Sequence, residues 1–259
     1  MSLYQPIDQP TLLKYLFYPR TYCKTAPENA YDLFVTVEEG VSIAVRFYVG
    51  VWDWPWILFF HGNGEVASDY DEIAPLYYQK GINLIVAGYR GYGASEGVPT
   101  FSSMINDAHY IFRAVEEEIK KKEYQHELWI MGRSLGSISA LELASKYSRS
   151  FEGIIVESGF LCVSRLIEHL GLPCSYKDLG ELESECIEKA KKITIPALII
   201  HGEFDSLIPV WLAEELYHSL GSSIKKMAVI PNADHNNLMF AGMEQYFKSI
   251  QQFIYNAVR

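Results

Sequence analysis

Short apolar runs separated by helical patterns constrain the fold of this chain more than any other feature. Six runs have the length of buried parallel strands. They are residues 56–60, 82–87, 128–131, 153–156, 195–200 and 227–230. Between them lie stretches with the helical period, the clearest of which has apolar residues from Met104 to Ile119. This alternation predicts an α/β fold with a doubly wound, mostly parallel sheet.

The segment before these runs has a different pattern. Alternate residues from Val41 to Val49 are apolar, which is the period of a half-buried strand. Residues 31–38 precede it closely and also have strand character. We therefore expect an N-terminal antiparallel hairpin at one edge of the sheet.

One interval interrupts the alternation of strands and helices. Residues 160–194 separate two predicted strands and carry two helical patterns around Pro173. We interpret this interval as a small helical cap inserted into a single domain of residues 1–259. Its apolar residues include Phe160 and Leu166, which we predict to contact substrate; the alternative is that they only dock the cap onto the core.

Composition excludes several classes of function. A net charge of −10 repels phosphate backbones, so nucleic acid is not expected as a partner. The chain has four cysteines, which are Cys23, Cys162, Cys174 and Cys186. Their spacing contains no C-x-x-C pair, which favours small core residues over a metal or redox site. Without a signal peptide or a run long enough to span a bilayer, we expect a cytoplasmic protein with no membrane anchor in this chain.

The candidate nucleophile is Ser134, in the string Gly132-Arg133-Ser134-Leu135-Gly136. This string follows the predicted strand 128–131 directly and precedes a helical pattern. A serine held on a sharp turn between strand and helix needs small neighbours on both sides, and the two glycines meet that requirement. An ordinary glycine-rich turn is the alternative, which the strand and helix context disfavours.

A serine nucleophile needs a base, and a histidine base needs a carboxylate. His235 lies just after the last predicted strand, so its ring is expected at the same edge of the sheet as Ser134. His109, His126, His169 and His218 fall in helical or connecting stretches and are expected to have packing or surface roles.

Asp205 is the favoured acid because it follows the predicted strand 195–200. Glu157 is an alternative at another strand end, and Glu203 and Asp234 are candidates nearer to solvent. With Asp205 the order along the chain is Ser, Asp, His, which is the order of the α/β-hydrolase triad.

The tetrahedral intermediate of acyl transfer needs backbone N–H donors aimed at its oxyanion. The glycine-rich loop after residues 56–60 supplies one such backbone, and the residue after the nucleophile supplies another. We predict the N–H groups of Asn63 and Leu135 as the oxyanion hole. His61 in the same loop is interpreted as a buried ring that braces the turn.

Five motifs occur in a fixed order along the chain: HGNGE, GYRGYGASEG, GRSLGS, HGEFDSLIP and ADHNN. In this order the sequence resembles the α/β-hydrolase superfamily from about Tyr31 onward. It is most similar to small single-domain serine hydrolases, some of them membrane-anchored, that act on acyl esters or thioesters. YLFYPR, at residues 15–20, looks like the segment before their catalytic domain, although the hydrophobic anchor before it is lacking here.

The resulting hypothesis is a serine hydrolase that cleaves carboxylic esters or thioesters of small to medium acyl groups through an acyl-enzyme, without metal or cofactor. A peptidase of the oligopeptidase type is the alternative, because HGEFDSLIP also resembles the acid segment of those enzymes. A binding module on the same fold is a third reading, since a fold does not determine function. The oligomeric state cannot be predicted from these patterns.

Overall fold

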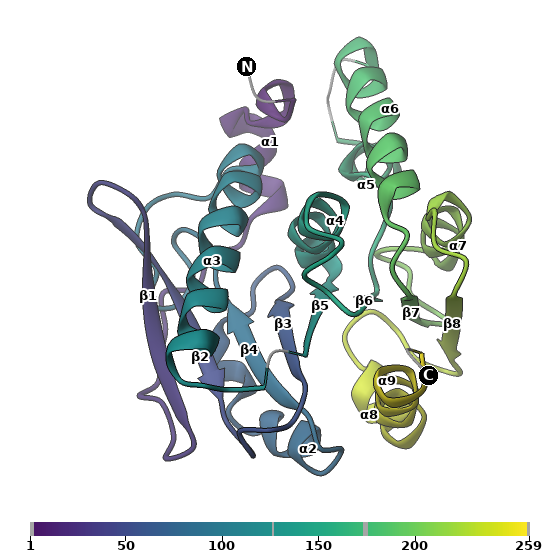
Figure 1. Cartoon of the computed structure of the whole chain (residues 1–259). Coiled ribbons are helices and arrows are strands. Elements are labelled where there is room, and N and C mark those ends of the chain that lie inside the picture. Colours follow the sequence, from purple (N-terminus) through teal and green to yellow (C-terminus); the bar gives the residue numbers. More distant parts are fainter. Residues whose placement is uncertain (1–2, 126, 173–175, 258–259) are drawn as a thin grey trace.

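A computed structural model describes residues 3–125, 127–172 and 176–257. Within these residues the chain forms one sheet of eight strands, in the order β1-β2-β4-β3-β5-β6-β7-β8 (Figure 1). The strands are β1 (Ala30–Glu38), β2 (Val41–Tyr48), β3 (Trp56–Phe60), β4 (Asn83–Ala87), β5 (Leu128–Arg133), β6 (Ile154–Glu157), β7 (Ala197–Gly202) and β8 (Lys225–Ile230). β2 pairs antiparallel with β1 and β4, and the other pairs are parallel. The predicted fold class, including the hairpin, is confirmed.

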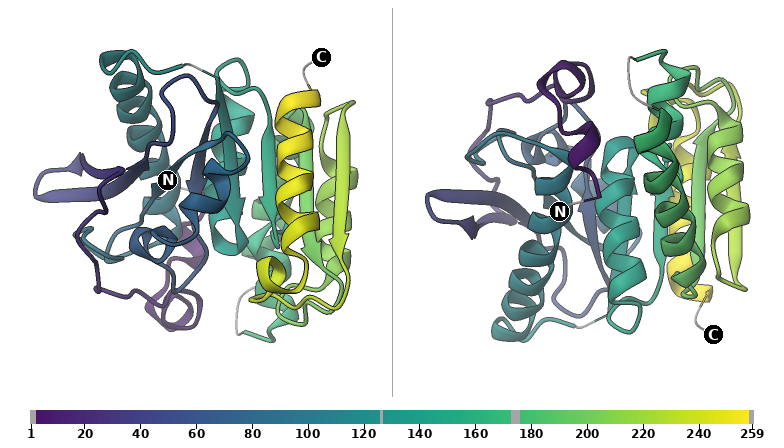
Figure 2. Two further views of the ribbon diagram at one scale, coloured as in Figure 1. Left: turned by 90° about the horizontal axis from the view of Figure 1, so that it is seen from below. Right: turned by 90° about the horizontal axis from the view of Figure 1, so that it is seen from above.

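Helices cover both faces of the sheet, as the two views of Figure 2 show. One face carries α2 (Ala74–Tyr78), α8 (Leu238–Ala241) and α9 (Met243–Asn256); the other carries α1 (Pro10–Leu16), α3 (Phe101–Lys121), α4 (Ser137–Lys146) and α7 (Val210–Ser219). The central strand β3 shows why both faces must be covered. Trp56, Leu58 and Phe60 belong to the hydrophobic cluster under α3 and α4, whereas Ile57 and Phe59 belong to the cluster under α2 and α9.

Three short 3₁₀ helices occur in the described residues. They are η1 (Gln5–Ile7), η2 (Ala67–Tyr70) and η3 (Ser134–Gly136). The third is the turn that joins β5 to α4, and it contains the candidate nucleophile.

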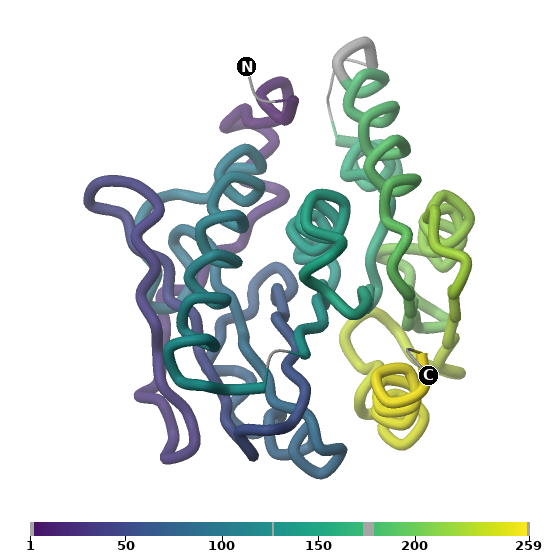
Figure 3. The backbone as a smooth tube through the Cα atoms, viewed as in Figure 1, coloured from purple at the N-terminus to yellow at the C-terminus, as the bar shows by residue number. Residues whose placement is uncertain are grey.

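The interval between β6 and β7 forms two helices, α5 (Val163–His169) and α6 (Tyr176–Lys192). Figure 3 traces them in green, beside α4 and α7. Arg165 on α5 lies 2.7 Å from Glu183 on α6 and 3.3 Å from Glu215 on α7. The first of these ion pairs joins the two inserted helices to each other, and the second joins α5 to α7. The predicted helical insertion is therefore present, although Pro173, between its two helices, lies outside the described residues.

Three cysteines have described positions, and all three are free thiols. Cys162 and Cys186 are buried and Cys23 is exposed; Cys174 lies outside the described residues, as does His126. Among the helices in the described ranges, none combines the length and the apolar character needed to cross a bilayer.

Candidate active site

Ser134 lies on the sharp turn that the sequence predicts. Its backbone φ of 51° is in the left-handed region, which is rare for a residue with a side chain. A Cβ on Gly132 would meet the backbone of Gly136, and a Cβ on Gly136 would meet the carbonyl oxygens of Phe60 and His61. Both flanking glycines are therefore required by close backbone packing, and the turn sits directly against the end of β3.

Three loops at the carboxyl ends of strands bring Ser134, His235 and Asp205 together. The Oγ atom of Ser134 lies 3.0 Å from Nε2 of His235. Nδ1 of His235 lies 2.7 Å from Oδ2 of Asp205. The three residues are 7%, 6% and 4% exposed, respectively, so the hydrogen-bonded chain is largely shielded from water. This geometry is the one that a serine nucleophile, its base and an orienting acid need.

The acid carboxylate is fixed by its own loop. Oδ1 of Asp205 accepts hydrogen bonds from the backbone N–H groups of Leu207 (3.1 Å) and Ile208 (2.8 Å), which leaves Oδ2 for His235. His201, at the end of β7, donates from Nε2 to the carbonyl oxygen of Ile208 at 2.7 Å. Burial lowers the pKa of His201, so the ring is neutral and braces this loop.

His201 is a residue that the sequence reasoning missed. The available signal was its position, four residues before Asp205 at the end of a predicted strand. A buried polar side chain needs a hydrogen-bond partner, and the loop that follows the strand lies next to this position.

The alternative acids are engaged elsewhere. Glu157 lies 3.1 Å from Nε of Arg133 and accepts a 2.8 Å hydrogen bond from the hydroxyl of Tyr246. Glu203 accepts from the backbone of Asn232, and Asp234 accepts from the N–H groups of Asn236 and Asn237. The geometry thus favours Asp205 as the partner of His235.

The predicted oxyanion loop and the serine turn leave the sheet side by side. Phe60, the last residue of β3, is paired with Gly132 on β5. Asn63 follows in the loop, and its side chain is held on both sides: Oδ1 accepts from Tyr18 N (2.9 Å) and Tyr92 Oη (2.6 Å), and Nδ2 donates to Leu16 O (3.0 Å). The backbone at Asn63 is thereby anchored to the N-terminal segment. Donation by Asn63 and Leu135 to an oxyanion stays a prediction.

His61 is buried as expected. Nδ1 of its ring donates to the carbonyl oxygen of Gly62 at 2.8 Å, and the ring meets Tyr89 edge to face. Burial lowers the pKa of the His61 imidazole, so it is uncharged. These contacts fit the predicted bracing role in the turn.

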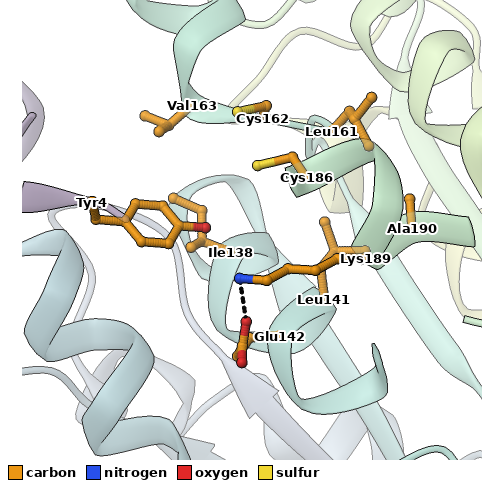
Figure 4. Close-up of a pocket in the computed structure, with 10 residues that line it drawn as sticks. All are labelled: Tyr4, Ile138, Leu141, Glu142, Leu161, Cys162, Val163, Cys186, Lys189 and Ala190. Carbon is orange, nitrogen blue, oxygen red and sulfur yellow. Dashed lines mark ion pairs between the residues drawn. The ribbon is translucent and has the colours of Figure 1, made fainter. Parts of the chain in front are cut away.

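The cap residues predicted to bind substrate are packed inside the protein. Phe160 is 1% exposed and Leu166 is 9% exposed, and both belong to the same hydrophobic cluster as the inner face of α4. This burial supports the alternative that they dock the cap, and contact with substrate stays a prediction. A small pocket lies nearby between α4, α5 and α6 (Figure 4), with a free volume of about 20 Å³, enough for one water molecule.

Metal chemistry has no evident site in the described ranges. No group of three or more histidine, cysteine, aspartate or glutamate side chains in this part of the chain is arranged to hold a metal ion.

Comparison with known proteins agrees with the fold. The esterase Pf2001 of Pyrococcus furiosus superposes with a TM-score of 0.74 at 17% identity, over 92% of this chain and 98% of the esterase. The membrane protein YNL320W of Saccharomyces cerevisiae is 29% identical over 181 residues, which are 69% of this chain and 62% of the relative. The lysophosphatidylserine lipase ABHD12 of Danio rerio is 25% identical over 226 residues, which are 73% of this chain and 58% of the lipase.

The two curated relatives are longer than the region they share with this chain, which spans about three fifths of their length. A family model gives the more extended match. Residues 55–173 and 173–239 match the family described as Serine aminopeptidase, S33. These residues include the predicted oxyanion loop and all three members of the Ser134, Asp205 and His235 cluster. The chain therefore belongs to the S33 family of α/β-hydrolases.

Proposed function

We propose that this hydrolase cleaves carboxylic esters or thioesters of small to medium acyl groups through an acyl-enzyme on Ser134. The observation that carries the proposal is the hydrogen-bonded chain from Ser134 through His235 to Asp205 at the strand ends. The esterase and lipase names among its relatives support the same reaction class.

The mechanism follows from the geometry. His235 Nε2 takes the proton of the Ser134 hydroxyl as Oγ attacks the acyl carbon, and Asp205 stabilises the imidazolium that forms. The N–H groups of Asn63 and Leu135 receive the oxyanion. His235 then gives its proton to the leaving alcohol or thiol, and the same residues activate water to release the acid.

The serine assignment is tested by covalent labelling with a fluorophosphonate probe. Ser134→Ala should abolish both labelling and ester turnover, because members of a triad act as a unit and loss of one costs on the order of 10⁴ to 10⁶ in kcat. Ser145→Ala, on the helix that follows, is the matched control and should label like the wild type. Labelling that survives Ser134→Ala would place the nucleophile elsewhere.

Peptide hydrolysis is the second candidate, because the family description refers to an aminopeptidase. An aminoacyl p-nitroanilide and an acyl p-nitrophenyl ester, compared on the same enzyme, separate the two. We expect kcat/KM to favour the ester by far more than the intrinsic reactivity difference of the two substrates. A preference for the anilide would replace the esterase proposal by the peptidase one.

Cellular location is also a proposal. The sequence favours a cytoplasmic protein, whereas the yeast relative carries the name of a membrane protein. Fractionation of cells that express the full chain would decide between the two.

A further inference from the structure

Arg133 occupies the position immediately before Ser134, and its side chain is buried rather than exposed. The residue is 6% exposed, although arginine is seldom buried without partners. It donates from Nε to Glu157 at 3.1 Å, forms an Nη1 ion pair with Glu65, and donates from Nη2 to the carbonyl oxygen of His235 at 2.8 Å. A single guanidinium, carried by the last residue of β5, therefore contacts the end of β6, the loop after β3 and the loop that carries the histidine.

The two carboxylates that pair with Arg133 also accept hydrogen bonds from buried tyrosine hydroxyls. Tyr70 donates its hydroxyl to Glu65 at 2.7 Å, and Tyr246 donates to Glu157 at 2.8 Å. Burial lowers the pKa of the Arg133 guanidinium, but the two carboxylates outweigh this effect and raise it, so the side chain is charged. Buried ion pairs of this kind contribute little net stability compared with apolar residues of similar volume. Stability alone is thus a weak reason for the arrangement.

The Glu65 end of this network reaches the oxyanion loop. Oε2 of Glu65 accepts a 2.8 Å hydrogen bond from the backbone N–H of Gly62, the residue before Asn63. A Cβ on Gly62 would collide with Nη1 of Arg133, so the loop backbone lies directly on the guanidinium. The position of Asn63 is consequently coupled to that of Arg133.

The other end of the network holds the base. The Nη2 contact is to the carbonyl oxygen of His235 itself, and a longer 3.4 Å contact reaches Oδ1 of Asn236. This carbonyl belongs to the residue whose ring must meet both Ser134 and Asp205. A displacement of about 1 Å in such a group can cost on the order of 10² in rate.

We infer that Arg133 is a positioning residue, which aligns the loop of His235 and the loop of Asn63 with Ser134 through one buried guanidinium. The inference rests on the proposed function, because it assigns a role in that same reaction. Arg133 touches no reacting atom; it acts through the backbone of His235 and, by way of Glu65, through the backbone of Gly62.

The test compares Arg133→Lys with Arg46→Lys. Arg46 is a matched control, because it is also buried (3% exposed), pairs with Asp32 and Asp71, and donates to the backbone carbonyl of Lys24, but on β2 at the antiparallel end of the sheet. A lysine keeps the charge but cannot donate to three partners in a fixed fork. Rates of ester turnover and of fluorophosphonate labelling are normalised to folded protein by active-site titration and circular dichroism.

We expect Arg133→Lys to lower kcat and the labelling rate by about 10- to 100-fold with little change in KM, whereas Arg46→Lys should keep the wild-type kcat per folded enzyme. A folded Arg133→Lys variant with wild-type kcat overturns the inference, as does an equal loss in both variants. If Arg133→Lys does not fold, Glu65→Gln decides: glutamine can still accept from Gly62, but it loses the ion pair. Glu65→Gln should lower kcat several-fold, and a wild-type kcat in this variant also overturns the inference.

Chemical rescue of kcat is a second readout, which is not expected to change if Arg133 has only a structural role. Free guanidinium ion at millimolar concentration should raise the kcat of Arg133→Gly, and an equal concentration of sodium chloride should not. Failure of the proposed function looks different, because the wild type would then not react with the fluorophosphonate or Ser134→Ala would still react. Rapid labelling of the wild type together with unaltered labelling of Arg133→Lys rejects the positioning role alone.

Discussion

Gly136 shows at the scale of one residue how the turn depends on the absence of a side chain. The space where its Cβ would lie is filled by the carbonyl oxygens of Phe60 and His61, which are backbone atoms and cannot rotate away. Gly136→Ala should therefore lower the free energy of unfolding by about 1 to 3 kcal/mol and also reduce kcat, because the oxyanion loop must move. Denaturant unfolding and ester turnover measure the two effects.

Gly180 on α6 is the matched control for this substitution. A Cβ there would meet nothing within 4 Å, and the residue lies inside a helix. Gly180→Ala should raise the free energy of unfolding by about 0.5 to 1 kcal/mol without a change in kcat. If both alanines were neutral, the close packing of the serine turn would not be the reason for its glycines.

Asp205 is the residue whose charge the proposed mechanism requires. Asp205→Asn should lower kcat by on the order of 10⁴, because the amide stabilises the wrong tautomer of His235 and cannot stabilise an imidazolium. Glu203→Gln, in the same loop but bonded to the backbone of Asn232, should leave kcat within about threefold of the wild type. Steady-state kinetics on a p-nitrophenyl ester measures both losses. A larger loss of kcat in Glu203→Gln than in Asp205→Asn would reassign the role of the acid to Glu203.

At the scale of elements, the N-terminal segment and the oxyanion loop form one unit through Asn63. Asn63→Ala removes hydrogen bonds to Leu16, Tyr18 and Tyr92, so the loop loses its anchor and kcat should fall about tenfold. Asn83→Ala is the control, because its amide similarly joins Gly50 and Val51 in loops remote from Ser134. A loss of stability alone in both variants would contradict the coupling of this segment to the site.

The helices α4 and α6 are joined by an ion pair between Glu142 and Lys189, at 2.6 Å. Burial raises the pKa of Glu142, but hydrogen bonds with His109 and Lys189 outweigh it and lower the pKa from 4.5 to about 2. A depressed folded-state pKa adds stability above pH 4.5, which is lost as the pH falls through about 2.

Glu142→Gln should accordingly lower the free energy of unfolding near pH 7 by about 1 to 2 kcal/mol. The difference from the wild type should shrink between pH 4.5 and pH 2. Urea unfolding at several pH values measures it. A deficit that is the same at pH 7 and pH 2.5 would mean that packing, and not the charge, is what the substitution disturbs.

At the scale of the whole molecule, the inserted helices share the core of the sheet. Apolar residues of α5 and α6, including Ile167 and Leu182, belong to the same hydrophobic cluster as those of α3 and α4. We therefore predict one cooperative unfolding transition, with coincident denaturant midpoints by tryptophan fluorescence and far-ultraviolet circular dichroism. An earlier separate transition that leaves most of the helical signal intact would show that the insertion is an independent unit.

The sequence by itself determined the fold class and the identity of the candidate triad. Buried parallel strands must be apolar on both faces, so their runs were visible, and strand ends of one sheet meet at one edge. Ser134, Asp205 and His235 could therefore be predicted from where each follows a strand. The structural role of the glycines beside Ser134 could be predicted, because a strained turn leaves no room for side chains.

Only the tertiary structure decided what supports these residues. Arg133 and the side chain of Asn63 bond to groups far away in the chain, and no local pattern shows which distant carbonyl or carboxylate a buried polar side chain will meet. The partner of His201, the carbonyl oxygen of Ile208, is close in the chain, but only the folded course of the loop brings the two together. The sequence also could not decide between the two roles of Phe160 and Leu166, which the structure shows to be buried. An apolar residue in an insertion suits a docking surface and a substrate cleft equally well, and only the folded position of the insertion distinguishes them. Periodicity reports which face of an element is apolar, whereas the partner of that face is settled by packing across the whole domain.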